Sequence, residues 1–151
     1  MSATYRELTA FRDRLEAAAN VDRERFLTEC TKELAARLLR KIIKRTPVGQ
    51  YPSGSGKVGG TLRRGWTGGE KSNAGQFVDS LSVTHRGNTY IVEIKNDVGY
   101  APYVEYGHRT RGGKGWVQGQ FMMTISEQEL RRQAPAILEK KLYKWLSGLM
   151  R

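Results

Sequence analysis

An apolar residue recurs every three or four positions from Phe26 to Ile43, and this is the strongest regular signal in the sequence. The spacing is the period of an α-helix with one buried face. Asp22 is a suitable N-cap, and Thr46-Pro47 ends the pattern because the residue before a proline resists the helical region. The chain is therefore expected to be built around a long amphipathic helix over residues 22–45.

Other periodic segments lie on both sides of this helix. Apolar spacing predicts a separate N-terminal helix over residues 1–20, with Asn20 as its stop. Residues 77–96 alternate like a β-hairpin, with the turn "HRGN" in which Gly87 and Asn88 can take positive φ. Helical spacing returns over residues 121–150, where Pro135 should kink a helix or start a new one.

The order of helices, then strands, then helices indicates an α+β fold. We expect a single domain over residues 1–151, with a small antiparallel β-sheet flanked by the long N-terminal amphipathic helix and the C-terminal helices. Its length of 151 residues suits one domain with a modest core.

Two segments rich in glycine interrupt the periodic pattern. Residues 47–75 read as Gly/Ser-rich loops around a short strand, "TLRRGW", anchored by Leu62 and Trp66. Residues 100–120 form a Tyr/Gly-rich segment that starts with a short helical turn closed by Gly107. Long loops in a small domain are uncommon and are usually functional or disordered.

Charge is the strongest global signal, with 26 Lys and Arg against 15 Asp and Glu, a formal net charge of +11. No acidic residue lies between Glu33 and Glu70. Such a block suits phosphate or an acidic protein surface, although solubility and helix C-terminal cations also account for it. The chain has no apolar run of membrane-spanning length and no apolar signal core at its start, which predicts synthesis in the cytoplasm.

Motifs for catalysis, metals and cofactors are weak. "GSGKVG" fits G-x-G-x-x-G but does not stand between a strand and a helix, so it reads as a flexible loop. Two histidines and the lone Cys30, expected to be a buried helix residue, have no zinc spacing. Glu105 and His108 share a helical face without a nucleophile beside them. We predict no enzyme activity, no cofactor and no metal.

Cations and aromatic rings gather in the two glycine-rich segments. This mixture suits stacking on nucleic acid, and it equally suits a protein interface. In the interface interpretation, the tyrosines pack a tight turn that Glu105, His108 and Arg109 fix or present to the next subunit. The candidate interface residues are Arg63, Arg64, Trp66, Tyr100, Tyr103, Glu105, Tyr106, His108, Arg109 and Trp116.

Several phrases together resemble a known family. They are "RTPVG" after the long helix, "GGTLRRGW" after a Gly/Ser loop, and "VEIKNDVGYAPYVEYGHRTRGGKGWVQGQFM" after the hairpin. The chain is similar over roughly residues 22–150 to the phage tail-component family of head–tail modules, found in tailed phages and prophages. Its most specific part is the "Y-A-x-Y-V-E-Y-G-H" pattern from Tyr100 to His108.

The resemblance implies a structural virion protein with a fold like that of tail terminators. Similar proteins form a ring, typically six-fold, at the head-proximal end of the tail tube. The ring ends tube growth and joins the tail to the head connector or stopper, while DNA passes through its lumen without specific binding. The sequence leaves two alternatives open: a different neck layer (stopper or adaptor), or a stand-alone basic nucleic-acid-binding protein.

Overall fold

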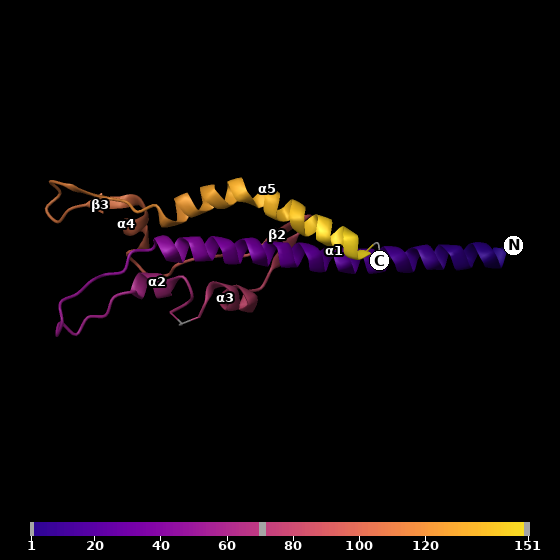
Figure 1. The fold of residues 1–151 in the computed structure, drawn as a ribbon, viewed down its shortest axis with the longest axis horizontal. Coiled ribbons are helices and arrows are strands. Elements are labelled where there is room, and N and C mark those ends of the chain that lie inside the picture. Colours follow the sequence, from indigo (N-terminus) through magenta and orange to yellow (C-terminus); the bar gives the residue numbers. More distant parts are fainter. Residues whose placement is uncertain (1, 70–71, 150–151) are drawn as a thin grey trace.

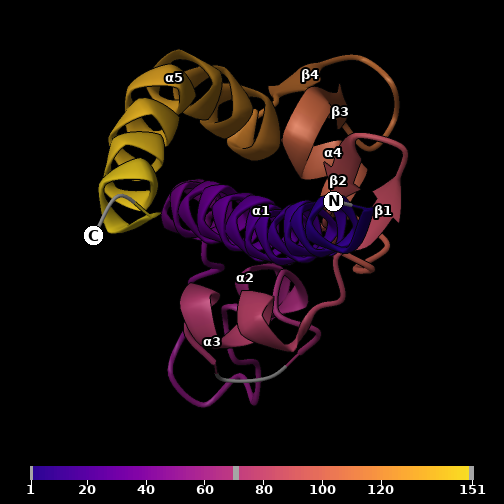
Figure 2. The same cartoon turned by 90° about the vertical axis from the view of Figure 1, so that its right-hand side faces the viewer.

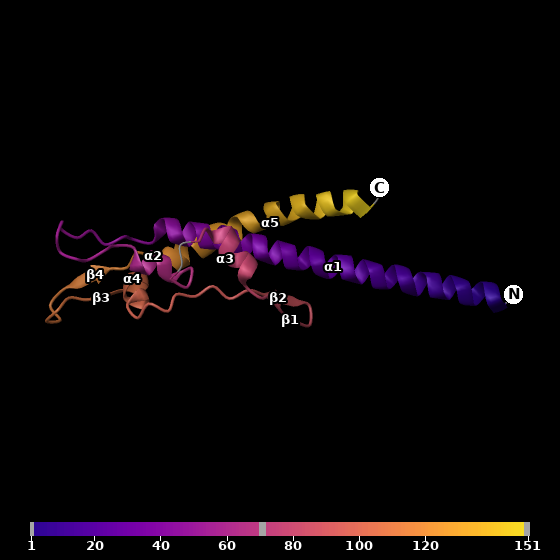
Figure 3. The same cartoon turned by 90° about the horizontal axis from the view of Figure 1, so that it is seen from below.

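The computed structural model describes residues 2–69 and 72–149. One helix, α1 (Ser2–Arg45), is its axis; its 44 residues correspond to about 66 Å at the usual rise of an α-helix. The other elements surround the C-terminal part of α1, with α5 on one side, α2 and α3 on another, and α4 with the strands on a third (Figures 1 and 2). The N-terminal part of α1 extends past them (Figure 3).

The continuity of α1 corrects the prediction of two helices separated at Asn20. Asparagine lowers helix stability by well under 1 kcal/mol relative to alanine. Three alanines, residues 17–19, precede Asn20, and no glycine or proline follows before Pro47. The helix therefore continues through Asn20, and it ends at Arg45.

Eight further helices and strands follow α1 within the described residues. The strands form two separate two-stranded antiparallel sheets, β1–β2 and β3–β4. The α+β class is thus confirmed, with two small sheets in place of one. The elements are α2 (Thr61–Gly65), α3 (Ala74–Ser80), β1 (Thr84–Arg86), β2 (Thr89–Ile91), α4 (Ala101–Tyr106), β3 (Gly107–Arg109), β4 (Trp116–Gln118) and α5 (Met122–Leu149).

Two predicted strands are helices. Most of the segment "TLRRGW" forms α2, and Leu62 in the helix and Trp66 at its C-cap lie four positions apart and are both buried. The anchoring role of these two residues was expected, and the extended conformation was wrong. Residues 74–80 form α3, because Asn73 and Gln76 make a capping box: the Gln76 amide donates to the Asn73 side chain at 2.8 Å.

The predicted hairpin is therefore shorter than residues 77–96. Its paired residues are 84–86 and 89–91, which leaves Gly87 and Asn88 as the two-residue turn. Gly87 has a φ of +59°, whereas Asn88 does not take the positive φ that the sequence allowed. At the C-terminus, α5 is one helix with Pro135 inside it, so no second helix starts there. It curves along its length (Figure 2), as a helix containing proline does.

The core is small and centred on α1. Leu39 and Ile42 are fully buried and pack with Val78 of α3, Trp66 and Met122. Cys30 is buried as expected, and burial raises the pKa of its thiol. Since few apolar side chains are enclosed, contacts between helices at the edge of the core carry part of the stability.

Two glutamates join α1 to α5. Glu129 of α5 accepts hydrogen bonds from Lys41, at 3.0 Å, and from Arg45 of α1. Glu33 of α1 is paired with Arg37, at 3.0 Å, and with Lys141 of α5. The hydrogen bond from Lys141 is the main cause that lowers the pKa of Glu33, and the hydrogen bond from Lys41 is the main cause that lowers the pKa of Glu129.

Candidate functional site: an exposed aromatic surface

Helix α4 (Ala101–Tyr106) has a buried side and an exposed side. Ala101 and Glu105, four positions apart, are buried. Tyr100, Tyr103 and Tyr106 recur every three positions on the opposite side and are exposed. Gly107 ends the helix with a φ of +88°, a value that glycine adopts without strain. The short helix therefore holds one carboxylate inward and three rings outward.

Glu105 is a structural residue. It is 7% exposed and caps the start of α5. Its carboxylate accepts from the Met123 amide at 3.0 Å, the Thr124 amide at 2.9 Å and the Thr124 hydroxyl at 2.7 Å. A carboxylate at a helix N-terminus satisfies free amides and suits the helix dipole. Glu105 was expected either to fix the turn or to meet the next subunit, and its side chain is enclosed within its own chain.

The outward residues form what we call the aromatic surface: Tyr100, Tyr103, Tyr106, His108, Arg109 and Trp116. Tyr103 is 59% exposed, Tyr106 64% and Trp116 58%. The interpretation that these tyrosines pack a tight turn is wrong, because backbone contacts shape the turn and the rings face solvent. A residue larger than glycine at position 119 would meet the Glu105 carbonyl at 2.4 Å, so close backbone approach fixes this region.

A hollow of about 580 Å³ lies within the aromatic surface. Tyr100, Tyr103, Val104, His108 and Arg109 line it. The rings of Tyr103 and His108 meet edge to face with centroids 6.1 Å apart. His108 Nδ1 donates to the Arg109 carbonyl at 2.9 Å, which orients the imidazole. The hollow is thus shaped before any partner arrives.

The β3–β4 hairpin carries the rest of the aromatic surface. Arg109 pairs with Trp116 across the two strands, so a cation and a ring lie on the same face. Beyond them, the Thr110 amide donates to the Gly115 carbonyl at 2.9 Å and closes the loop. Arg111 and Lys114 are exposed in this loop. The surface is therefore aromatic at its centre and basic at its edge.

The other predicted interface residues turn inward. Trp66 is 4% exposed, and its Nε1 donates to the Thr46 hydroxyl at 2.9 Å. Arg63 Nη2 donates to the Thr46 carbonyl at 2.8 Å, and Arg64 Nη1 donates to the Gly59 carbonyl at 3.2 Å. Trp66, expected at an interface, is enclosed within its own chain, and both arginines are partly buried and bonded to backbone. Thr46, which the sequence marked only as the end of the long helix, holds Trp66 and Arg63 at the end of α1.

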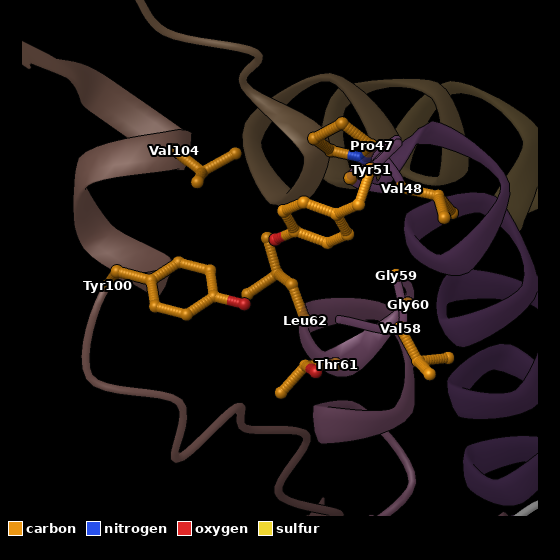
Figure 4. Close-up of a pocket in the computed structure, with 11 residues that line it drawn as sticks. Pro47, Val48, Tyr51, Val58, Gly59, Gly60, Thr61, Leu62, Tyr100 and Val104 are labelled. Atoms are coloured by element: carbon orange, nitrogen blue, oxygen red, sulfur yellow. The ribbon is translucent and has the colours of Figure 1, made fainter. Parts of the chain in front are cut away.

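A pocket of about 250 Å³ lies between α2 with its preceding loop and α4. Figure 4 shows Tyr51 of the Gly/Ser loop and Tyr100, the N-cap residue of α4, reaching into it beside Leu62. The described side chains that line it are apolar apart from the hydroxyl groups of Tyr51, Thr61 and Tyr100. Such a lining offers packing and hydrogen bonds to a partner, and holds no carboxylate, imidazole or thiol.

Glu105 and His108 do not form an acid–base pair. Glu105 points to α5 and His108 bonds to the Arg109 carbonyl. Among residues 2–69 and 72–149, no three His, Cys, Asp or Glu residues gather as a metal site would require. Nor is any helix in those ranges long and apolar enough to cross a membrane.

The chain matches the sequence model of one protein family, described as "Bacteriophage HK97-gp10, putative tail-component", over residues 9–107. The match starts earlier than the resemblance noted from the sequence, and it ends at Gly107, so it includes α4 and stops at the first residue of β3. No curated protein and no solved structure matches. The likeness to the tail-terminator fold therefore stays a prediction.

Proposed function

Because this chain belongs to the HK97-gp10-like family of bacteriophage tail components, we propose that it is a structural virion protein of the phage neck. Copies assemble in the host cytoplasm into a ring, of six subunits by the family resemblance, at the head-proximal end of the tail tube. The ring ends tube growth and joins the tail to the head connector or stopper. The aromatic surface is the observation that carries this proposal.

Its chemistry suits a protein partner. Tyr, Trp and Arg are the residues that most often anchor protein interfaces, because they bury large area with few rotatable bonds. Tyr103, Tyr106 and Trp116 are each more than half exposed in the free chain. Contact with another protein would remove this apolar area from water. The preformed hollow also lowers the ordering cost of binding.

Charge favours a contact between unlike faces. The chain carries a formal net charge of +11, so two identical basic faces repel each other. A ring uses heterologous contacts, in which one face of a subunit meets a different face of its neighbour. The aromatic surface, with Arg109 beside Trp116 and Arg111 in the adjoining loop, fits a less basic face of a neighbouring subunit, the tail tube protein or the connector.

Electron microscopy of particles from the phage or prophage, with this gene deleted, tests the proposal. We expect full heads without tails, together with free tails of abnormal length. Complete and infectious particles would contradict the neck assignment. Tails that are absent altogether would place the protein in another part of the tail.

A paired substitution then tests the aromatic surface itself. Tyr103→Ser with Tyr106→Ser removes two exposed rings and should leave the melting temperature unchanged while reproducing the deletion defect. Tyr143→Ser is the matched control, because Tyr143 is 76% exposed on α5, outside the aromatic surface. Normal assembly of the double variant would remove the aromatic surface from the proposal.

A further inference from the structure

A second surface, away from the aromatic one, lies between α1 and α5. A groove of about 530 Å³ is lined by Glu33, Arg37, Ala136, Ile137, Lys140, Lys141 and Lys144. We call it the basic groove. Four of its seven lining residues are cationic and one is acidic.

The one acid does not neutralise the groove. Glu33 is bonded to Arg37 and Lys141, so it holds these two cations in place. Lys140 and Lys144 are exposed and have no acidic partner within 4 Å among the described residues. They lie four positions apart on α5, and therefore on one face of it. Two ammonium groups thus face solvent without a partner.

The basic character continues along α1. Arg37, Arg40 and Lys44 follow at intervals of three and four positions, which places them on one face of the helix. Arg40 and Lys44 are exposed and, like the two lysines of α5, have no acidic partner in the part of the chain that the structure describes. This face lies in the acid-free interval between Glu33 and Glu70.

The chemistry of the groove differs from that of the aromatic surface. Its apolar lining consists of Ala136 and Ile137 alone, and it has no aromatic ring to anchor a protein partner. Flexible lysines and arginines in a row, without anchors, suit a polyanion whose charges repeat along its length. We propose that the basic groove binds the phosphate backbone of double-stranded DNA.

The proposal predicts binding without sequence preference, since contacts to phosphate position a protein and do not read bases. It goes beyond the neck function proposed above, because it concerns other residues and can be measured on the isolated chain. Loss of DNA binding and loss of assembly are therefore separate results.

Fluorescence anisotropy with a labelled duplex of about 20 base pairs, measured over a series of salt concentrations, tests the proposal. The affinity of the full chain should fall steeply with salt, because each neutralised phosphate contributes roughly 0.9 to the log–log slope. Lys140→Gln with Lys144→Gln should reduce that slope by roughly 1.8. Neither lysine has an ion-pair partner among the described residues, so the variant should keep the melting temperature of the parent chain.

Lys57→Gln with Arg86→Gln is the matched control. It also removes two positive charges, from exposed positions outside both the groove and the aromatic surface, and should leave the slope unchanged. Equal losses in both variants would show that net charge alone drives binding and would overturn the assignment to the groove. No binding to duplex DNA at low salt would also overturn it, and would assign the groove to an acidic protein.

Discussion

Residues 59–67 and residues 100–118 are built from the same residue types, glycine, arginine and large aromatic rings, but they face opposite ways. The first segment turns Trp66 inward and ties both arginines to backbone carbonyls. The second turns Tyr103, Tyr106 and Trp116 to solvent. The difference shows that composition marks a segment as able to form contacts, while the nearest neighbour decides whether those contacts are made within the chain.

The neighbour of the first segment is the end of α1. Thr46 offers a hydroxyl to Trp66 and a carbonyl to Arg63 at the point where α1 stops. The second segment meets α5 through the carboxylate of Glu105 and through the buried Ala101, while Tyr103, Tyr106 and Trp116 stay exposed. The first segment therefore stabilises the fold, and the second leaves exposed the rings that we propose for assembly.

The largest effect on stability should come from comparing the two tryptophans. Trp66→Ala opens a cavity in the core and leaves Thr46 without its indole partner, so we expect a loss of about 3–5 kcal/mol in the free energy of unfolding. Trp116→Ala, at an exposed position, should change it by less than about 0.5 kcal/mol. Urea denaturation measures both, and equal losses would refute the inward–outward distinction.

Removal of the cap on α5 should have the next largest effect. Glu105→Ala deprives the Met123 and Thr124 amides of their acceptor, and hydrogen bonds to a charged group predict a loss of about 2–3 kcal/mol. Glu93→Ala, an exposed glutamate before α4, is the control and should be nearly neutral. If Glu105→Ala unfolds at the same urea concentration as the parent chain, the carboxylate is not a structural cap.

A smaller loss is expected at Thr46. Thr46→Val keeps the shape of the side chain but leaves the Trp66 indole nitrogen without its acceptor in a buried site. An unpaired buried donor predicts a loss of about 1–2 kcal/mol. Thr89→Val on the exposed strand β2 is the control. Thermal melting of both variants gives the comparison, which fails if the two melting temperatures agree.

The smallest expected effect is a dependence on pH. Lys141 and Arg37 hold the pKa of Glu33 below its ordinary value of 4.5. The stabilisation that ionised Glu33 gives to the folded state is therefore complete above pH 4.5. It is lost as the pH falls through the lower pKa that Glu33 has in the folded state. The urea concentration at the unfolding midpoint should decrease when the pH is lowered below 4.5. In Glu33→Gln this decrease should be less steep. An unchanged pH profile in Glu33→Gln would contradict this role.

Several features of this chain were predictable because they depend on residues close together in sequence. The apolar period around Leu39 and Ile42, the burial of Cys30 and the turn closed by Gly107 are local patterns, and all three are confirmed. The capping box of Asn73 and Gln76 was also readable and outweighs the alternating pattern from Phe77 to Val83. The helical segment and the alternating, strand-like pattern overlap from Phe77 to Ser80. Apolar alternation alone does not separate a short helix from a strand.

The sequence by itself determined the long helix, the α+β class and the family, because periodicity and motifs are carried by neighbouring residues. Only the tertiary structure decided which rings are buried, which arginines are bonded to backbone and where the free cations gather. Trp66 and Glu105 were expected at an interface and are instead enclosed by α1 and α5. Lys140 and Arg37 form one groove across 103 positions of sequence, the difference between 140 and 37. Such contacts arise from packing between distant segments, and no local pattern encodes them.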